Sequence, residues 1–234
     1  MNKKSVCVVI SAYNEESVIA AVVTDVVTAF RDKPYDTKIV VIDDHSSDGT
    51  YDRAREAGAQ VVRHVLNTGH GGAVSTGIMF AEKNRCDIAA IMDGDGQHLG
   101  ADAVKGVEKL IETNSDLLIG SRLIEGQGMS TVKQVGNLGL NMITRILFGI
   151  RSTDSQSGMR IFSDKAIHKL RWKSSGYEFC SEMLWRARQL GLVVGEYPIK
   201  AIYTEYSLSK GQNNWNGINI VKSLLKRRIS ELFQ

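Results

Sequence analysis

The stretch Ile88-Ala89-Ala90-Ile91-Met92-Asp93-Gly94-Asp95-Gly96-Gln97-His98 decides how the fold of this chain is interpreted. Its five leading apolar residues predict a short buried strand, and two carboxylates separated by a glycine follow directly. Open α/β sheets bind their ligands at the carboxyl ends of their strands, so Asp93 and Asp95 are expected at such an edge. Hard oxygen ligands at this spacing suit Mg²⁺ or Mn²⁺ held together with substrate phosphates. Ordinary turns use the same residue types, so the motif depends on partners elsewhere in the chain.

Composition narrows the class of protein. A length of 234 residues and an apolar content of 43% are typical of a globular protein with a sizeable core. The net charge of +3 is too small to indicate a nucleic-acid partner. Residues 217–234 hold four cations and one anion, so residues 1–216 are neutral overall. The net positive charge of the chain is therefore concentrated in residues 217–234.

The cysteines and the lack of long apolar runs bear on location. Cys7, Cys86 and Cys180 are widely spaced and lie in or beside apolar runs, which favours buried reduced thiols. There is no signal-peptide pattern, and no run approaches the ~20 apolar residues that span a bilayer. We expect a cytoplasmic protein, peripheral at the cytoplasmic face of a membrane.

Apolar runs alternate with helical patterns, which predicts βαβ units and a mainly parallel sheet flanked by helices. The predicted strands are Ser5–Ile10, Lys38–Ile42, Gln60–Val65, Asp87–Met92, Asp116–Gly120, Met159–Phe162 and Val193–Ile199. The predicted helices are Glu16–Arg31, Thr50–Ala57, Gly72–Lys83, Ala101–Thr113, Asn137–Phe148 and Glu178–Leu190. We expect one α/β domain over residues 1–216 and a basic amphipathic helix over residues 217–234.

Polar residues follow three of these strands. Residues 11–16, 43–50 and 93–98 each bring acids or amides to the same predicted edge of the sheet. A carboxylate there can accept hydrogen bonds from ribose hydroxyls or from the N–H groups of a base, and Tyr13 could stack on that base. We therefore assign function to Glu15 and Asp44. The glycine-rich stretch 67–72 matches neither a dinucleotide fingerprint nor a P-loop, so it predicts close packing and site shaping.

Together these motifs resemble the family 2 glycosyltransferases with the GT-A fold, in particular the dolichyl- and polyprenyl-phosphate mannosyl- and glucosyltransferases. The resemblance runs from Val6 to about Lys210 and rests on six landmarks in the expected order. They are Ala12-Tyr13-Asn14-Glu15, residues 43–50, residues 67–72, residues 93–98, Gly120-Ser121-Arg122 and residues 154–160.

The resemblance implies an inverting, metal-dependent transfer of a hexose from a nucleoside-diphosphate sugar to a polyprenyl or dolichyl phosphate. It implies that Asp95 and Gln97 hold Mg²⁺ or Mn²⁺ on the diphosphate, with Asp95, Arg122 and Asp154 as catalytic residues. The donor site that it implies consists of Ala12, Tyr13, Glu15, Asp44, Asp93, Gly94, Asp95, Arg122 and Lys210. Where relatives often carry arginine before the late Ser-Lys, this chain has Glu205 between two tyrosines, which leaves the choice between GDP and UDP donors open.

The acceptor depends on whether the site contains a general base. Transfer to a sugar hydroxyl requires a carboxylate that takes the proton, and Asp154 is the candidate by position. A polyprenyl phosphate is already ionised at neutral pH, since its second pKa is about 6, and instead requires cations. Arg122 and Arg160 are the candidate acceptor contacts. Asp154 is equally well interpreted as a turn or helix-cap carboxylate.

The basic segment 217–234 has apolar residues at helical spacing with cations between them, which predicts contact with an anionic membrane surface. The alternatives are a helix packed on the domain, with a solvated basic face, and a homo-oligomer contact. Two other functions stay open: transfer to a glycan hydroxyl in polysaccharide assembly, and a donor-binding subunit that needs a membrane partner.

Overall fold

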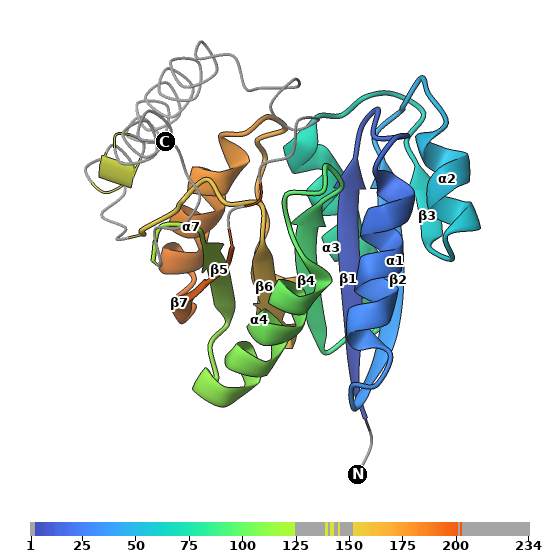
Figure 1. The fold of residues 1–234 in the computed structure, drawn as a ribbon. Helices are drawn as coiled ribbons and strands as arrows, with labels where there is room; N and C mark the ends of the chain where they lie inside the picture. The colour runs from blue at the N-terminus through green and yellow to red at the C-terminus, as the bar shows by residue number, and fades with distance from the viewer. Residues whose placement is uncertain are drawn as a thin grey trace.

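The computed structural model describes residues 3–124, 139, 141, 142, 145, 152–200 and 202. Within them, one mixed sheet of seven strands has the order β3-β2-β1-β4-β6-β5-β7, and Figure 1 shows it between helices. The strands are β1 Lys4–Ala12, β2 Tyr35–Asp43, β3 Gln60–Arg63, β4 Ile88–Asp93, β5 Leu117–Ser121, β6 Arg160–Ser163 and β7 Val194–Pro198. The helices are α1 Ile19–Phe30, α2 Thr50–Glu56, α3 His70–Lys83, α4 Gly100–Thr113, α6 Asp164–Lys169 and α7 Phe179–Gln189.

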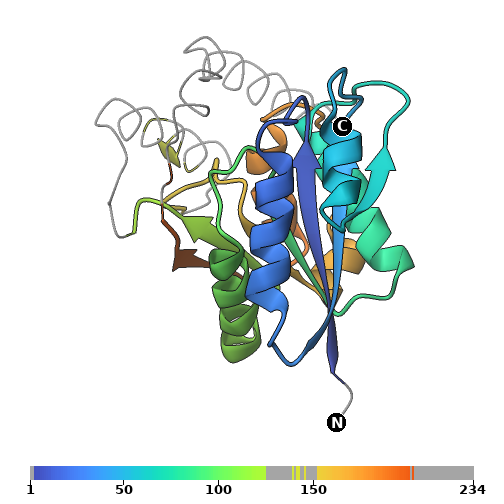
Figure 2. The same ribbon diagram turned by 45° about the vertical axis from the view of Figure 1, so that its right-hand side comes forward.

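The alternation of side chains along β1 divides the core into two layers. Val6, Val8 and Ile10 pack on the side that α1 and α4 cover, and these two helices lie side by side in front of the sheet in Figure 2. Cys7 and Val9 pack on the opposite side, with residues of α3, α6 and α7. Because both faces are covered, the central strands are almost wholly apolar, as their sequences predict.

The strand register brings the predicted polar ends together. β1 is parallel to β2 and to β4, with Ala12 opposite Asp43 and Ser11 opposite Asp93. The carboxyl ends of these three strands therefore lie at one edge of the sheet, the upper edge in Figure 1. This confirms the predicted common edge.

The second half of the sheet differs from a simple parallel arrangement. β6 runs antiparallel to both β4 and β5 and lies between them. The short helix α6 was not predicted, although Ser163 is a typical N-cap whose side chain accepts a hydrogen bond from the amide of Ala166. The antiparallel placement depends on the hydrogen bonds that β6 makes with both β4 and β5, which periodicity does not reveal.

Two predictions fall outside the described residues. These are the late loop with Lys210 and the segment 217–234; most of the predicted helix Asn137–Phe148 lies outside them as well. In the part of the chain that the structure describes, no helix is long and apolar enough to cross a bilayer.

Candidate active site

Asp93 lies at the centre of the polar edge, where β4 ends. Its Oδ1 is 3.0 Å from Nε2 of His70, and its Oδ2 is 3.5 Å from Nε2 of His98. Burial by itself would raise the pKa of Asp93, but the two facing imidazoles outweigh burial and hold this pKa well below the usual value. Asp93 is therefore ionised at neutral pH. The sequence predicts a supporting role for both histidines, and the structure places His70 at the start of α3 and His98 in the loop after β4, each facing Asp93.

Asp95 follows in the turn after β4. Burial raises its pKa, and the neighbouring negative charge of Asp93 raises it further. Its Oδ1 accepts a hydrogen bond from the amide of Gln97, 3.0 Å away, so the turn itself directs the carboxylate. Asp93 and Asp95 thus form a pair of close acids whose mutual repulsion a cation would relieve.

These acids fit the Mg²⁺ or Mn²⁺ that the sequence implies. The described residues contain no group of three or more His, Cys, Asp or Glu side chains that could hold a metal ion alone. A divalent ion at Asp95 would therefore need further oxygen ligands from a substrate, as Mg²⁺ commonly does. The half-buried Gln97 lies in the same turn, and the nearby charge of Glu15 also raises the pKa of Asp95.

The first strand supplies the predicted donor contacts at its end. Ala12 is buried, whereas the ring of Tyr13 is 50% exposed and so is available for stacking. Glu15 is buried, and its amide donates to Oγ1 of Thr50 at 2.8 Å. Gly94 lies against β1, where its amide donates to the carbonyl of Ser11 at 2.8 Å. Ala12, Tyr13 and Gly94 thus lie at the same edge of the sheet as Asp93.

Asp44 has a role that its sequence position did not reveal. Its Oδ1 accepts hydrogen bonds from Nδ1 of His64 at 2.7 Å and from the amide and hydroxyl of Thr68, both at 2.8 Å. Its Oδ2 accepts from the amide of Gly69 at 2.8 Å. Burial would raise the pKa of Asp44, but these hydrogen bonds outweigh it and lower the pKa. Asp44 therefore anchors the loop before α3.

Two glycines allow close approach around the acids. Gly71 leaves no room for a Cβ next to the carbonyl of Ser174, and its amide donates to the carbonyl of Ser175 at 2.7 Å. This supports packing as the reason for the glycine-rich stretch. A Cβ on Gly158 would collide with the carboxylate of Asp93, so the loop before β6 lies directly on the acidic motif.

Arg122 and Asp154 lie in contact. Nε of Arg122 is 2.7 Å from Oδ2 of Asp154, its Nη2 is 2.9 Å from Oδ1, and its amide donates to Oδ2 at 3.1 Å. The Asp154 side chain is 0% exposed and that of Arg122 is 16% exposed. Both oxygens of the candidate base are thus engaged by one guanidinium in a two-point ion pair, a strong arrangement.

Arg160 corrects one expectation. It was predicted to contact an acceptor, but it is 0% exposed. Its guanidinium donates to the carbonyl oxygens of Ser155, Ser157 and Cys180 at 2.8, 3.1 and 3.3 Å. The loop before β6 and the start of α7 turn these carbonyl oxygens toward the guanidinium, and buried acceptors require a donor. In this structure Arg160 therefore supports the loop.

Sequence reasoning missed several of these partners. His64 and Thr68 hold Asp44, and Asn141 holds both the carbonyl of Thr153 and the amide of Ser155. Each partner lies 12 to 24 residues away from the residue it contacts. No local motif signals such contacts, because they depend on how separate loops meet at the sheet edge.

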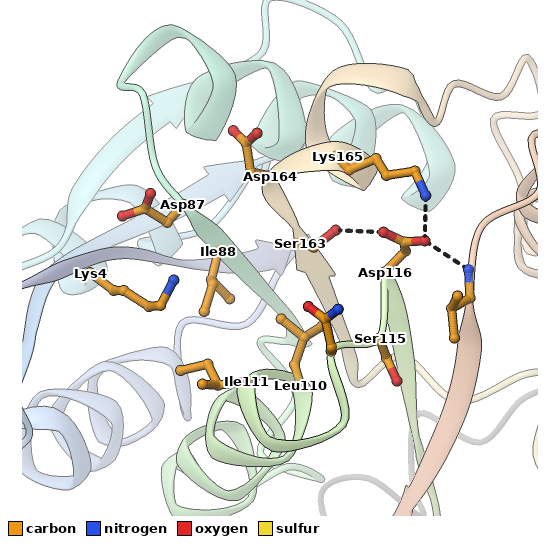
Figure 3. A pocket seen from close by; sticks show the side chains of 12 residues that line it. Lys4, Asp87, Ile88, Leu110, Ile111, Ser115, Asp116, Ser163, Asp164 and Lys165 are labelled. Atoms are coloured by element: carbon orange, nitrogen blue, oxygen red, sulfur yellow. Dashed lines mark hydrogen bonds and ion pairs between the residues drawn. The ribbon is translucent and has the colours of Figure 1, made fainter.

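A pocket of about 510 Å³ lies elsewhere on the molecule. Figure 3 shows its lining, with Asp116 bound to Lys165, Ser163 and the amide of Val193. Ile88 opens β4 at this pocket, so the cavity borders the amino-terminal edge of the parallel strands, opposite Asp93. It is separate from the candidate active site.

Comparison with known proteins gives consistent relatives. The family model described as glycosyl transferase family 2 matches residues 7–171. A UDP-N-acetylglucosamine–dolichyl-phosphate N-acetylglucosaminyltransferase of Methanococcus voltae is 37% identical over 254 aligned positions, covering 99% of each chain. An undecaprenyl-phosphate mannosyltransferase of Micrococcus luteus is 30% identical over 193 positions, covering 77% of this chain and 78% of that protein.

The fold also has solved counterparts. Glucosyl-3-phosphoglycerate synthase from Mycobacterium tuberculosis, crystallised with Mn²⁺, UDP-glucose and phosphoglyceric acid, superposes with a TM-score of 0.70. The match covers 94% of this chain and 79% of that chain at 22% identity. At that identity the likeness supports the fold, which is the predicted GT-A arrangement.

Proposed function

The chain belongs to glycosyl transferase family 2, and from this premise we propose that it transfers a sugar from a nucleoside-diphosphate donor to a polyprenyl phosphate. The observation that carries the proposal is the ion pair between Arg122 and Asp154. A carboxylate that is fully buried and engaged at both oxygens is a poor general base, because proton transfer would have to break the pair. An acceptor that is already ionised needs no such base.

The residues at the sheet edge divide the work. Tyr13, Glu15 and Asp44 would hold the nucleoside, and Asp93 with the main chain at Gly94 would contact the nucleotide. Asp95 and Gln97 would hold the divalent ion, which supplies positive charge to the departing diphosphate. Arg122 would meet a substrate phosphate, because its side chain is 16% exposed while Asp154 fixes the direction of its guanidinium. Lys210 would cover the diphosphate.

For the donor we favour a UDP-linked sugar. The Methanococcus voltae relative, which covers 99% of this chain, is named for UDP-N-acetylglucosamine. The Micrococcus luteus relative, named as a mannosyltransferase, is less similar at 30% identity. GDP-linked sugars are therefore the comparison set in the experiment.

The test is transfer of label from a panel of radiolabelled UDP- and GDP-sugars into a polyprenyl phosphate, with Mg²⁺, Mn²⁺ or a chelator. We expect label in the lipid phase, lost with Asp95→Ala or chelator and retained with the exposed control Asp52→Ala. Donor hydrolysis alone, or label that enters only a glycan hydroxyl, would overturn the proposal. Activity that requires an added membrane fraction would instead identify a donor-binding subunit with a membrane partner.

We also propose that the enzyme works at the cytoplasmic membrane surface through its basic segment 217–234. The cations of this segment alternate with apolar residues in the sequence, a pattern that suits anionic lipid headgroups. Sedimentation with anionic vesicles should fall when Lys222 and Lys226 are changed to Glu in the full chain. The matched control changes Lys109 and Lys83, which lie on helices of the folded domain, to Glu. Equal binding of both variants would contradict membrane contact through this segment.

A further inference from the structure

A second set of contacts lies beside the Arg122–Asp154 pair and starts from β7. Glu196, on β7, directs both carboxylate oxygens at the loop before β6. Oε1 accepts from Oγ of Ser152 at 2.7 Å and from the amide of Thr153 at 2.8 Å. Oε2 accepts from Oγ1 of Thr153 at 2.7 Å. One side chain on the edge strand therefore holds the two residues that precede Asp154.

The contacts continue from Thr153 to the end of β5. Oγ1 of Thr153 is 2.7 Å from Oγ of Ser121, which is fully buried. Oγ of Ser121 also accepts from the amide of Leu123 at 3.2 Å. Ser121 and Thr153 are the sequence neighbours of Arg122 and Asp154, so two adjacent cross-links join the same pair of loops.

The direction of these hydrogen bonds follows from the number of protons available. An ionised carboxylate only accepts, so the single hydroxyl proton of Thr153 is donated to Glu196. Thr153 must then accept from the hydroxyl of Ser121, which in turn accepts from the amide of Leu123. The negative charge of Glu196 thus orients a continuous chain of hydrogen bonds. The chain runs through Thr153 to Ser121 and Leu123, the residues on either side of Arg122 in the sequence. The hydrogen bonds within such a chain strengthen one another where they are partly buried.

We propose that Glu196 is a positioning residue that holds the Arg122–Asp154 pair in its working geometry through Thr153 and Ser121. Its contacts described above are with Ser152 and Thr153, the two residues that precede Asp154. Removing its charge would reverse or break the donor chain and allow the two loops to separate. The guanidinium of Arg122 would then lose its fixed direction. The inference rests on the proposed transferase function only in its kinetic part.

The first arm of the test does not depend on activity. Amide hydrogen exchange is compared in the wild type, Glu196→Gln, Thr153→Val and the exposed-helix control Glu56→Gln. In Glu196→Gln and Thr153→Val we expect exchange at Arg122 and Leu123 to be faster by about tenfold, the effect of losing one hydrogen bond to a charged group. The control should match the wild type. Unchanged exchange in both site variants would overturn the proposal.

The second arm separates positioning from mere support of the fold. The substrate whose KM rises in Arg122→Lys should show a rise in KM in Glu196→Gln as well, with unchanged KM in Glu56→Gln. Thr153→Ser keeps the hydroxyl and should therefore retain wild-type kinetics. The rise in KM in the double variant Glu196→Gln with Thr153→Val should not exceed the larger of the two single-variant effects. Both substitutions interrupt the same chain of hydrogen bonds, so their effects should not add. Faster exchange with wild-type kinetics would overturn positioning.

The two arms of the test distinguish a failure of the proposed transferase function from a failure of the positioning role of Glu196. If the wild type moves no sugar to a polyprenyl phosphate, the proposed function fails, and the exchange comparison still decides whether Glu196 holds Arg122. Should Glu196→Gln fail to fold, Thr153→Val tests the same chain from its middle. That variant removes one hydroxyl from an exposed residue.

Discussion

Arg122 and Asp154 form a two-point ion pair in which the Asp154 side chain is completely buried and the Arg122 side chain is partly exposed. The pair joins the end of β5 to the loop before β6, two segments 32 residues apart. The unequal exposure of the two partners gives the pair a direction: the anion serves as the anchor and the cation as the group presented outward. This relationship determines how the residues around it should respond to substitution.

Stability should depend more on Arg122 than on Asp154. Arg122→Met leaves a buried carboxylate without its cation, a loss of about 3–5 kcal/mol in the free energy of unfolding. Asp154→Asn leaves the unpaired charge on a side chain that is partly exposed, so its cost should be smaller. Denaturant unfolding at neutral pH measures both variants. An equal or larger loss in Asp154→Asn would contradict the assignment of Asp154 as the anchor.

Gly158→Ala should impair the site while leaving the fold intact. The added Cβ would occupy the position of the Asp93 carboxylate, so the acid or the loop must move. We expect donor binding to weaken by at least about tenfold, because a residue that contacts the nucleotide is displaced from its position. Titration calorimetry with UDP measures it. Gly139→Ala is the control, since none of the described neighbours lies within 4 Å of a Cβ there; wild-type affinity in Gly158→Ala would refute the close contact.

Asp44 should contribute stability that depends on pH in a defined direction. Its pKa is lowered in the folded state, so the ionised form favours folding. That contribution is complete above the unfolded pKa of about 3.9 and is lost as the pH falls through the folded value. The difference in unfolding free energy between the wild type and Asp44→Asn should therefore shrink below about pH 4. Denaturant unfolding from pH 3 to 7 tests this; a gap that widens toward acid would reverse the sign.

Arg160 should behave as a structural residue. Its guanidinium satisfies three buried carbonyls and lies over the ring of Phe179, 5.5 Å from the ring centroid. Arg160→Met leaves these acceptors unpaired and should lower the unfolding free energy by about 3 kcal/mol or more. The exposed Arg31→Met should cost little. If Arg160→Met instead raised the acceptor KM at unchanged stability, the original expectation of an acceptor contact would be restored.

The sequence by itself determined the order of strands and helices in the first half and the edge where the acids meet. Strand and helix periods are local properties, since burial of one face imposes a repeat of 2 or 3.6 residues over a short stretch. The acids after β1, β2 and β4 then meet because parallel strands share their carboxyl edge. Six motifs in a known order were also sufficient to indicate the family.

Only the tertiary structure decided which charged groups face each other. It turned Arg160 inward, engaged Asp154 with Arg122, and gave Asp44 its donors from the loop before α3. It also placed β6 antiparallel between β4 and β5. Most of these pairings join residues far apart in the chain, and they depend on strand register and on side-chain direction. Those are set by packing of the whole sheet, so no local pattern encodes them.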